Sequence, residues 1–520
     1  MASTIQFGKN IINILTSGMY KHPEFLFREY IQNAADQIDK DKGNADSDER
    51  ILIYLDKTNR EIRIEDKATG IPSSDVYRIL GNVAASEKVA GTDKGMFGIG
   101  RLGGLSYCDS LVFETSYRGE SVSTSMTWDA KTLLEKASSQ DEHIDAATLI
   151  SSVITLTKNE APSDEHYFRV ILKNVPERFS VLLDKERVLN YLRMTAPVKI
   201  DESKFSLYGK VREFLRRGNL NEPSTYRVFL NDEEIKKPYH TYADAPQQRT
   251  EKYKIRDIKT QIFKNDAGLI QGWAWVGFRD FSESASVIRQ DCTFRGIRLR
   301  LHNIQIGGED ALTHLYHEDR AAKYFVGEIH VLDSTLTPNA RRDYFAHTPE
   351  FDQFEKQVAV FLNSLFKEVR EDSKIASMRK KIKQQGQIIR DYEDRRSRGF
   401  IDPEEKEDWE NRKKDAEMAL AKEVQRYKKL TSEEDGYPRQ ESENRQASKS
   451  RETLDEQSES QTGLAKKGRI PLVTDKLNGY NRSEKKIITK ILKVISKSLK
   501  NEPERYIEIE EAIINTLKKK

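Results

Sequence analysis

Apolar residues recur at helical spacing near the start of the chain and then at every second position. The first pattern predicts a helix within 7–20. Residues 51–56 and 61–66 alternate apolar and polar side chains on either side of a polar stretch, which predicts a β-hairpin. Further strands are expected at 110–117, 153–158 and 168–175. This mixture predicts an α+β domain over residues 1–176.

A second mixed pattern occupies residues 177–371. Apolar alternation predicts strands there, and apolar residues on one side of 351–371 predict a long helix. The expected strands are 226–235, 272–280, 296–306 and 327–332. We therefore expect a second α+β domain.

From residue 372 the composition becomes highly charged. Helical patterns on either side of a Gly-Phe-Ile-Asp-Pro break predict a hairpin or coiled-coil arm over 372–430. Residues 431–467 are rich in Ser, Glu, Gln and Arg with few apolar positions, which predicts a disordered linker. Two amphipathic patterns within 468–520 predict a small helical tail module that docks on a partner or on a second copy.

Composition narrows the class of protein. Charged residues make up 33% of the 520-residue chain and hydrophobic residues 37%, as in a protein with a very polar surface. Two cysteines are too few for a disulfide framework or a zinc cluster, which favours a reducing compartment. No apolar run is long enough to span a bilayer and no secretory signal is visible, so we expect a cytoplasmic protein without membrane contact. The net charge of +3 does not by itself indicate nucleic acid.

The helix expected after residue 23 carries polar groups on a single stripe. Glu29, Asn33 and Asp36 are spaced about one turn apart, while Ile31 and Ala35 can face a core. Alone, such a stripe is more often a solvated face than a site. Whether this stripe is a site therefore depends on the motifs that follow it.

Three further motifs follow this helix in order. Asp66 ends the second strand and Gly70 follows it, which would place a carboxylate on a pocket floor with backbone free to approach a ligand. Residues 81–94 are small, flexible and basic, as in a lid over phosphates. Residues 95–100 then supply three glycines ahead of a helix, where backbone amides bind phosphate oxygens.

The ordered set resembles the GHKL superfamily of ATPases, which includes Hsp90, MutL, type II topoisomerases, MORC proteins and histidine kinases. The likeness to Hsp90 extends further, because 294–306 and 331–345 resemble strands and a loop of its middle domain. The resemblance implies a Bergerat ATP-binding α/β sandwich, an S5-like α/β middle domain and a helical carboxy-terminal region. The lid and the charged arm resemble MORC proteins at least as well.

Roles follow from this resemblance by position. It implies that Glu29 polarises the water that attacks the γ-phosphate, that Asn33 binds Mg²⁺, and that Asp66 accepts a hydrogen bond from the adenine amino group. Arg342, from the second domain, would stabilise charge on the γ-phosphate. The other expected nucleotide contacts are Asp36, Gly70, Ser86, Lys88, Lys94, Gly95, Gly98 and Gly100.

Two positions depart from the family pattern. Ala68 stands where the family has the first glycine of its Asp-x-Gly-x-Gly motif. Tyr167 and Phe168 stand where it has a Gly-Thr pair. Neither change touches the expected hydrolytic residues, but both bear on base selectivity.

Two functions remain open on the sequence alone. One is an Hsp90-like chaperone or remodeller, a homodimer gated by ATP and Mg²⁺ that acts on a protein client or partner. The alternative is a MORC-like or MutL-like ATPase that clamps DNA, in genome maintenance or antiviral defence. Stimulation of ATP hydrolysis by a protein or by DNA would discriminate them. A scaffold that uses ATP only as a switch is disfavoured by Glu29.

Overall fold

The structure is a computed structural model in which nine stretches of the chain are described. They are residues 8–16, 22–42, 50–82, 100–139, 144–244, 252–279, 287–432, 472–499 and 502–518. The chain divides into one unit of Met1–Asp280 with Ser286–Glu368, and a second unit of Phe281–Ala285 with Val369–Lys520. The expected disordered linker 431–467 lies almost wholly outside the described residues.

The first sheet has eight strands in the order β5-β4-β3-β6-β2-β1-β7-β8. The strands are β1 (Arg50–Asp56), β2 (Glu61–Asp66), β3 (Ser110–Ser116), β4 (Val122–Asp129), β5 (Ile154–Glu160), β6 (Tyr167–Lys173), β7 (Arg227–Leu230) and β8 (Glu233–Glu234). The expected hairpin is β1–β2, in which Ile53 lies opposite Ile64. Ile51 and Ile53 are fully buried, because alternate residues of a strand point to one face.

Helices accompany this sheet. They are α1 (Asn10–Thr16), α2 (Phe25–Asp41), α3 (Val76–Gly81), α4 (Ala130–Ser138), α5 (Ala146–Ser152) and α6 (Lys185–Thr195), with 3-10 helices η1 (Gly100–Tyr107) and η2 (Glu177–Leu183). The core gathers Phe27, Ile31 and Ala35 of α2 against Trp128 of β4 and Leu172 of β6. Helix α2 is therefore packed into the domain rather than exposed on one side.

The strand expected to open the second domain lies in the first sheet instead. Strand β7 pairs in parallel with β1, with Ile51 opposite Val228. The first sheet thus extends to residue 234, beyond residue 176 where the sequence pattern placed the boundary. A four-residue strand gives no signal of the sheet that it will join, because its partner is distant in sequence.

The second sheet has six strands in the order β13-β12-β14-β11-β10-β9. They are β9 (Tyr242–Asp244), β10 (Lys252–Lys264), β11 (Ile270–Arg279), β12 (Gly296–Leu301), β13 (Ile304–Ile306) and β14 (Val326–Val331), with α7 (Tyr208–Arg217), η3 (Thr313–Leu315) and η4 (Asp319–Tyr324) nearby in sequence. Trp275 of β11 packs against Phe205 and Tyr239 with ring centroids 5.4 and 4.9 Å apart. Trp273 and Trp275 of this strand are thus core residues.

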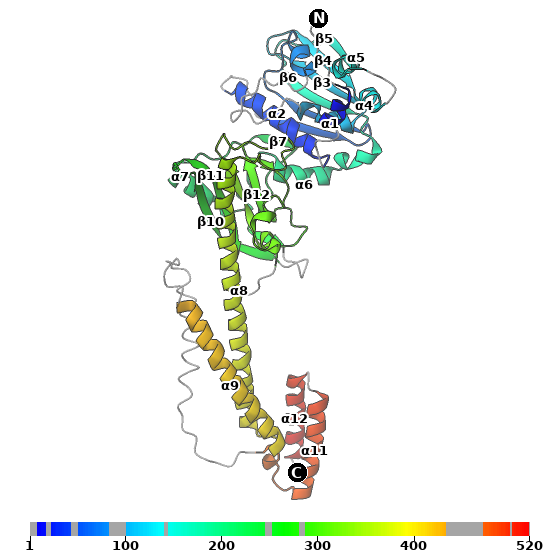
Figure 1. Cartoon of the computed structure of the whole chain (residues 1–520). Coiled ribbons are helices and arrows are strands. Elements are labelled where there is room, and N and C mark those ends of the chain that lie inside the picture. The colour runs from blue at the N-terminus through cyan, green and yellow to red at the C-terminus, as the bar shows by residue number, and fades with distance from the viewer. Residues whose placement is uncertain are drawn as a thin grey trace. The chain divides into compact units, whose positions relative to one another are not determined.

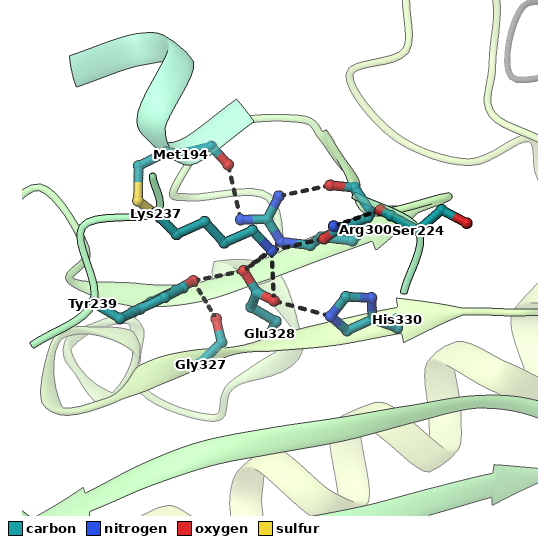
Figure 2. A network of polar contacts seen from close by, with 9 residues as sticks. Met194, Ser224, Lys237, Tyr239, Arg300, Gly327, Glu328 and His330 are labelled. Atoms are coloured by element: carbon teal, nitrogen blue, oxygen red, sulfur yellow. Dashed lines mark hydrogen bonds and ion pairs between the residues drawn. The ribbon is translucent and has the colours of Figure 1, made fainter. Parts of the chain in front are cut away.

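A fully buried polar network crosses this second sheet (Figure 2). Lys237 Nζ donates to both oxygens of Glu328 at 2.9 and 3.0 Å, and Arg300 Nε donates to the same carboxylate at 2.5 Å. Tyr239 donates to it at 3.0 Å, and His330 Nε2 lies 2.9 Å away. Burial alone would raise the pKa of Glu328, but Arg300 and Lys237 hold it well below its ordinary value. The carboxylate is thus the charge around which the network is built.

The network also reaches helix α6 and the segment before β7. Arg300 Nη2 donates to the carbonyl of Met194 in α6 at 2.8 Å, and Asn303 Nδ2 donates to the carbonyl of Ser224 at 2.9 Å. Helix α6 and the segment before β7 are therefore tied to β12 and the turn after it.

The carboxy-terminal region is helical. Helix α8 (Pro349–Arg398) starts in the first unit and continues into the second, followed by α9 (Pro403–Ser432), η5 (Val473–Lys476), α11 (Arg482–Ser498) and α12 (Pro503–Leu517). Helices α8 and α9 run side by side (Figure 1), and Lys413 of α9 reaches Glu393 of α8 at 3.1 Å. At the turn, Arg395 binds Glu405 of α9 at 3.0 Å and Glu510 of α12 at 2.7 Å.

Helix α8 runs through residue 372, where the charged arm was expected to begin. It is a single helix of 50 residues that includes both 351–371 and 378–396, and the two compact units divide within it between Glu368 and Val369. The stretch between them has neither Pro nor Gly, so its change in composition does not interrupt the helix. With two sheets and a helical carboxy-terminal region, the expected mixed α+β fold class is confirmed.

Candidate active site

Helix α2 carries the expected polar stripe into the interior of the first unit. Glu29 and Asp36 are buried, and Asn33, one turn after Glu29, is half-buried. Tyr30 on the same helix joins it to η1: its hydroxyl donates to the carbonyl of Arg101 and accepts from the Gly104 N–H, both at 3.0 Å. The stripe is therefore part of a packed site and not a solvated face.

The glycine at the start of η1 lies directly against Glu29. A Cβ at Gly100 would be 2.4 Å from Oε2 of Glu29, a distance that real Cβ atoms do not show. A side chain at this position would displace the carboxylate of Glu29. Glycine lets the end of the glycine-rich loop approach the acid while the carboxylate keeps this position.

Asp66 stands at the end of β2 and is almost wholly buried. The N–H of Ala68 donates to its Oδ1 at 3.1 Å. Burial raises the pKa of Asp66 to about 8, and the neighbouring carboxylates Glu65 and Asp41 add to the rise. A buried carboxyl group with a raised pKa is a candidate ligand contact, because its burial has no evident structural gain.

The loop after Asp66 needs a glycine at its end. Gly70 has φ +75°, and a Cβ there would lie 2.0 Å from the carbonyl oxygen of Ser116. The next N–H, of Ile71, donates to Thr115 Oγ1 at 2.9 Å. Ala68, which replaces a glycine of the family pattern, is fully buried, so its methyl group is accommodated.

An ionic cluster that the sequence pattern did not predict holds the 66–70 loop. Arg118 binds both oxygens of Asp41 at 2.6 and 3.0 Å, and its Nη2 lies 3.4 Å from His166 Nε2. The other ring nitrogen of His166 lies 2.9 Å from the carbonyl oxygen of Ala68. The end of α2, the turn between β3 and β4, the residue before β6 and the 66–70 loop are thereby linked.

Arg342 lies in a tight loop that follows the second sheet. Pro338 and Phe345 form a bridge across it, and the Arg342 N–H donates to the carbonyl of Asn339 at 3.0 Å. Arg342 itself has φ +54°, a left-handed conformation that is uncommon for residues other than glycine. Such local strain is found most often at functional sites.

The same loop brings Arg342 to α2. Its Nη1 donates to Oε1 of Gln32, and its Nε lies 3.9 Å from Oε1 of Glu29. Arg342 is buried, whereas the neighbouring Arg341 is exposed. Glu29 and Arg342, which were expected to act together, are therefore in contact range although more than 300 positions separate them in the sequence.

Arg28 is a further site residue that the sequence analysis missed. It is almost fully buried, and its Nη2 donates to Glu29 Oε1 at 3.2 Å. Its guanidinium also donates to the carbonyls of Arg342 at 3.1 Å and Arg341 at 3.5 Å, and stacks 4.6 Å from the Phe25 ring centroid. The available signal was a second polar stripe, Arg28 and Gln32, beside the first.

Several expected contacts cannot be placed. Ser86, Lys88, Lys94, Gly95 and Gly98 lie outside the described residues, so their roles stay predictions. Across the described stretches, no group of three or more His, Cys, Asp or Glu side chains could hold a metal ion. A cation at Asn33 would thus need ligands other than such a protein cluster. In the same stretches, no helix has the length and apolarity needed to cross a membrane.

Comparison with known proteins finds a family of ATPases and chaperones. Residues 22–161 match the family model described as histidine kinase-, DNA gyrase B-, and HSP90-like ATPase. The chain is 27% identical to the chaperone protein HtpG of Buchnera aphidicola subsp. Baizongia pistaciae over 141 residues, which are 23% of this chain and 22% of that protein.

Two further relatives carry the same name. The chain is 27% identical to the chaperone protein HtpG of Acinetobacter baylyi over 139 residues, 23% of this chain and 22% of that protein. It is 30% identical to that of Chlorobium phaeobacteroides over 133 residues, 21% of each chain. The chain thus spans about a fifth of the length of the curated relatives it matches.

Proposed function

We propose that this chain hydrolyses ATP at the α2 site in an Mg²⁺-dependent reaction, because residues 22–161 match the family model described as histidine kinase-, DNA gyrase B-, and HSP90-like ATPase. The observation that carries the proposal is the approach of Arg342 to Glu29 at 3.9 Å. It brings a general base and a cation for the γ-phosphate together from distant parts of the chain.

The residues have distinct tasks in this proposal. Glu29 takes the proton of the attacking water, and Arg342 stabilises the charge that develops on the γ-phosphate. Asp66 accepts from the adenine amino group on the floor of the site, where Gly70 lets the backbone pass close to the base. Bound Mg²⁺ would neutralise phosphate charge, with Asn33 as the expected protein ligand.

Fit of the nucleotide is supported by the shape of the chain around these residues. Gly100 can approach Glu29 only because it lacks a Cβ, and Gly70 is held in a conformation that other residues rarely adopt. Both glycines therefore let the backbone pass close to the proposed site, Gly100 beside Glu29 and Gly70 in the loop after Asp66. Backbone exposed in this way can approach a phosphate or a base closely.

The wider proposal is an Hsp90-like chaperone or remodeller that works as an ATP-gated homodimer on protein clients in the cytoplasm. The name of the relatives, chaperone protein HtpG, supports it. Two buried cysteines without a disulfide support a reducing compartment. Contact between Arg342 and α2 supports gating, because any motion of the loop changes the site.

ATP hydrolysis by Glu29→Gln tests the proposal. The amide keeps the size of the side chain but cannot take a proton, so we expect kcat to fall at least about 100-fold with nucleotide affinity within about threefold of wild type. Glu61→Gln, on the half-buried first position of β2, is the matched control and should hydrolyse ATP normally. Normal turnover by Glu29→Gln would show that the α2 site is not catalytic.

A further inference from the structure

The hairpin of α8 and α9 separates its charges along its length. Residues 373–390 of α8 and 422–431 of α9 contain ten Lys and Arg against one acid, Glu423, a net charge of 10 − 1 = +9. We call these two stretches the basic half of the hairpin. Residues 391–421 contain seven Lys and Arg against eleven Asp and Glu, a net charge of 7 − 11 = −4. The whole chain carries only +3, so this segregation is far from its average composition.

The two stretches lie together in the second unit. Arg379 Nη2 donates to the hydroxyl of Tyr427 at 3.1 Å, and Lys381 lies 3.8 Å from Glu423. Residues 379–381 of α8 therefore lie beside 423–427 of α9, which returns along α8 after the turn. The basic residues of both helices are gathered at one end of the hairpin.

Almost none of this positive charge is neutralised within the hairpin. All ten basic side chains are exposed: Lys374, Arg379, Lys380, Lys381, Lys383, Arg390, Lys422, Arg426, Lys428 and Lys429. Glu423 is shared by Lys381 and Arg426. Among the residues that the structure describes, Lys380, Lys383 and Lys428 have no ion pair. Concentrating so many like charges costs free energy through their repulsion, unless a polyanion accompanies them.

We infer that the basic half of the hairpin binds double-stranded DNA through its phosphate backbone. Lys374 and Arg390 are 16 positions apart, which is about 24 Å of helix at ~1.5 Å per residue. Arg379, Lys383 and Arg390 are spaced by four and seven residues, so they share one side of α8. An array of cations along one helix fits a polyanion with regularly spaced phosphates.

The surroundings of these cations argue against other polyanions. A membrane surface would require exposed apolar side chains beside the basic ones, and none of the exposed large hydrophobic residues of the described chain lies within either stretch. Single-stranded RNA is held by stacking of its bases on aromatic rings. The basic half contains one aromatic residue, Tyr427, and Arg379 already contacts it, so a series of stacking platforms is not present there. Backbone contacts alone predict binding without sequence preference.

The inference goes beyond the proposed ATPase and does not depend on it. Fluorescence anisotropy of a labelled 20-base-pair duplex, titrated with the full chain between 50 and 300 mM NaCl, tests it. Wild type should bind at 50 mM NaCl and weaken steeply with salt. The triple variant Lys380→Gln, Lys383→Gln, Lys428→Gln should bind at least about tenfold more weakly, with the salt slope reduced by about 2.7 because each lost phosphate contact contributes about 0.9.

Matched variants separate the site from overall charge. Arg396→Gln, Arg412→Gln, Lys414→Gln removes three exposed charges from the other half of the hairpin and should bind as wild type does. Replacing Lys380, Lys383 and Lys428 by Arg keeps the charge and should keep binding, which guards against a folding defect in the glutamine variant. Glu29→Gln should also bind normally, so that loss of ATPase activity and loss of DNA binding are distinguishable.

Several outcomes would overturn the inference. They are no duplex binding by wild type at 50 mM NaCl, equal loss in both triple glutamine variants, and tighter binding to single-stranded RNA of the same length. Preferential binding to vesicles with about a third of anionic lipid would overturn it as well, since it would assign the basic half to a membrane surface.

Discussion

Asp66→Asn tests the buried carboxyl group at the end of β2, and we expect this variant to be more stable than wild type and poorer at binding ATP. The carboxyl group is almost wholly buried, and its Oδ1 accepts from the Ala68 N–H at 3.1 Å. Asparagine has the same shape and can keep that hydrogen bond. Unlike the carboxyl group, asparagine has no ionised form, so its burial adds no pH-dependent cost to the free energy of folding.

The magnitude follows from the pKa shift. The pKa of Asp66 rises from 3.8 to about 8 in the folded protein, first through burial. Between these values the folded state binds the proton and the unfolded state does not, so stability falls as pH rises, by about 1.4 kcal/mol per pH unit from this group. At pH 7 the accumulated cost is about 4 kcal/mol. Above pH 8 it no longer grows.

Hydrogen exchange read by mass spectrometry on peptides from β2 and β6 measures unfolding of the first sheet in the full chain. Comparison of Asp66→Asn with wild type at the same pH cancels the intrinsic pH dependence of exchange. Protection of the variant should exceed that of wild type, by a margin that grows about tenfold between pH 6 and 7. Asp56→Asn is the control: the pKa of Asp56 is lowered by hydrogen bonds from Asn59, so this variant should gain nothing.

The same variant should lose ATP affinity by about 100-fold or more. Because Oδ1 is held by the Ala68 N–H, the Asn Nδ2 stands where the free carboxyl oxygen stood, and it would face the adenine amino group with a second donor. Lower protection than wild type at pH 7, or a margin that does not change with pH, would refute the reasoning on burial. Unchanged ATP affinity would refute the adenine contact.

Three further predictions concern the residues around the site and the second sheet. Arg28→Ala should lower kcat about 10-fold or more with little change in nucleotide Kd, measured by steady-state hydrolysis and nucleotide titration, because its charged hydrogen bonds hold both Glu29 and the 341–342 loop. Gly70→Ala should lower the midpoint of thermal unfolding more than Gly119→Ala, because both have positive φ but only Gly70 has a backbone oxygen 2.0 Å from the added Cβ. Glu328→Gln should destabilise the second sheet by about 3–5 kcal/mol, seen as lost exchange protection in β12 and β14, because it leaves buried cations without their carboxylate.

Local patterns were enough to predict much of the first domain. The alternation in 51–56 and 61–66 corresponds to β1 and β2, and the helix that carries Glu29 is α2. These predictions succeed because the residues that specify each element lie within it. Strand β4, by contrast, is rich in Ser and Thr and has no strong apolar signal, although Trp128 and Met126 within it are fully buried.

Contacts between distant residues could not be derived from spacing. The approach of Arg342 to Glu29 was expected only through resemblance to a family, and the part played by Arg28 was not expected at all. Arg28 reads as an ordinary helix charge until the carbonyls of residues 341–342 are placed beside it. The left-handed conformation of Arg342 is equally invisible in sequence, because residues other than glycine give no signal for it.

The two oxygens of Glu29 face different neighbours, and this bears on how the proposed reaction is gated. Oε1 lies 3.2 Å from Arg28 Nη2 and 3.9 Å from Arg342 Nε, whereas Oε2 faces Gly100 at the end of the glycine-rich stretch. A carboxylate oxygen engaged by a guanidinium is a weaker proton acceptor than a free one. The water is therefore expected at Oε2, on the side of the phosphate loop, with the arginines holding Oε1 in place. Movement of the 341–342 loop would then shift Glu29, the base, and Arg342, the phosphate-stabilising cation, together. The second sheet would in this way be coupled to hydrolysis although the strands of that sheet do not contact ATP.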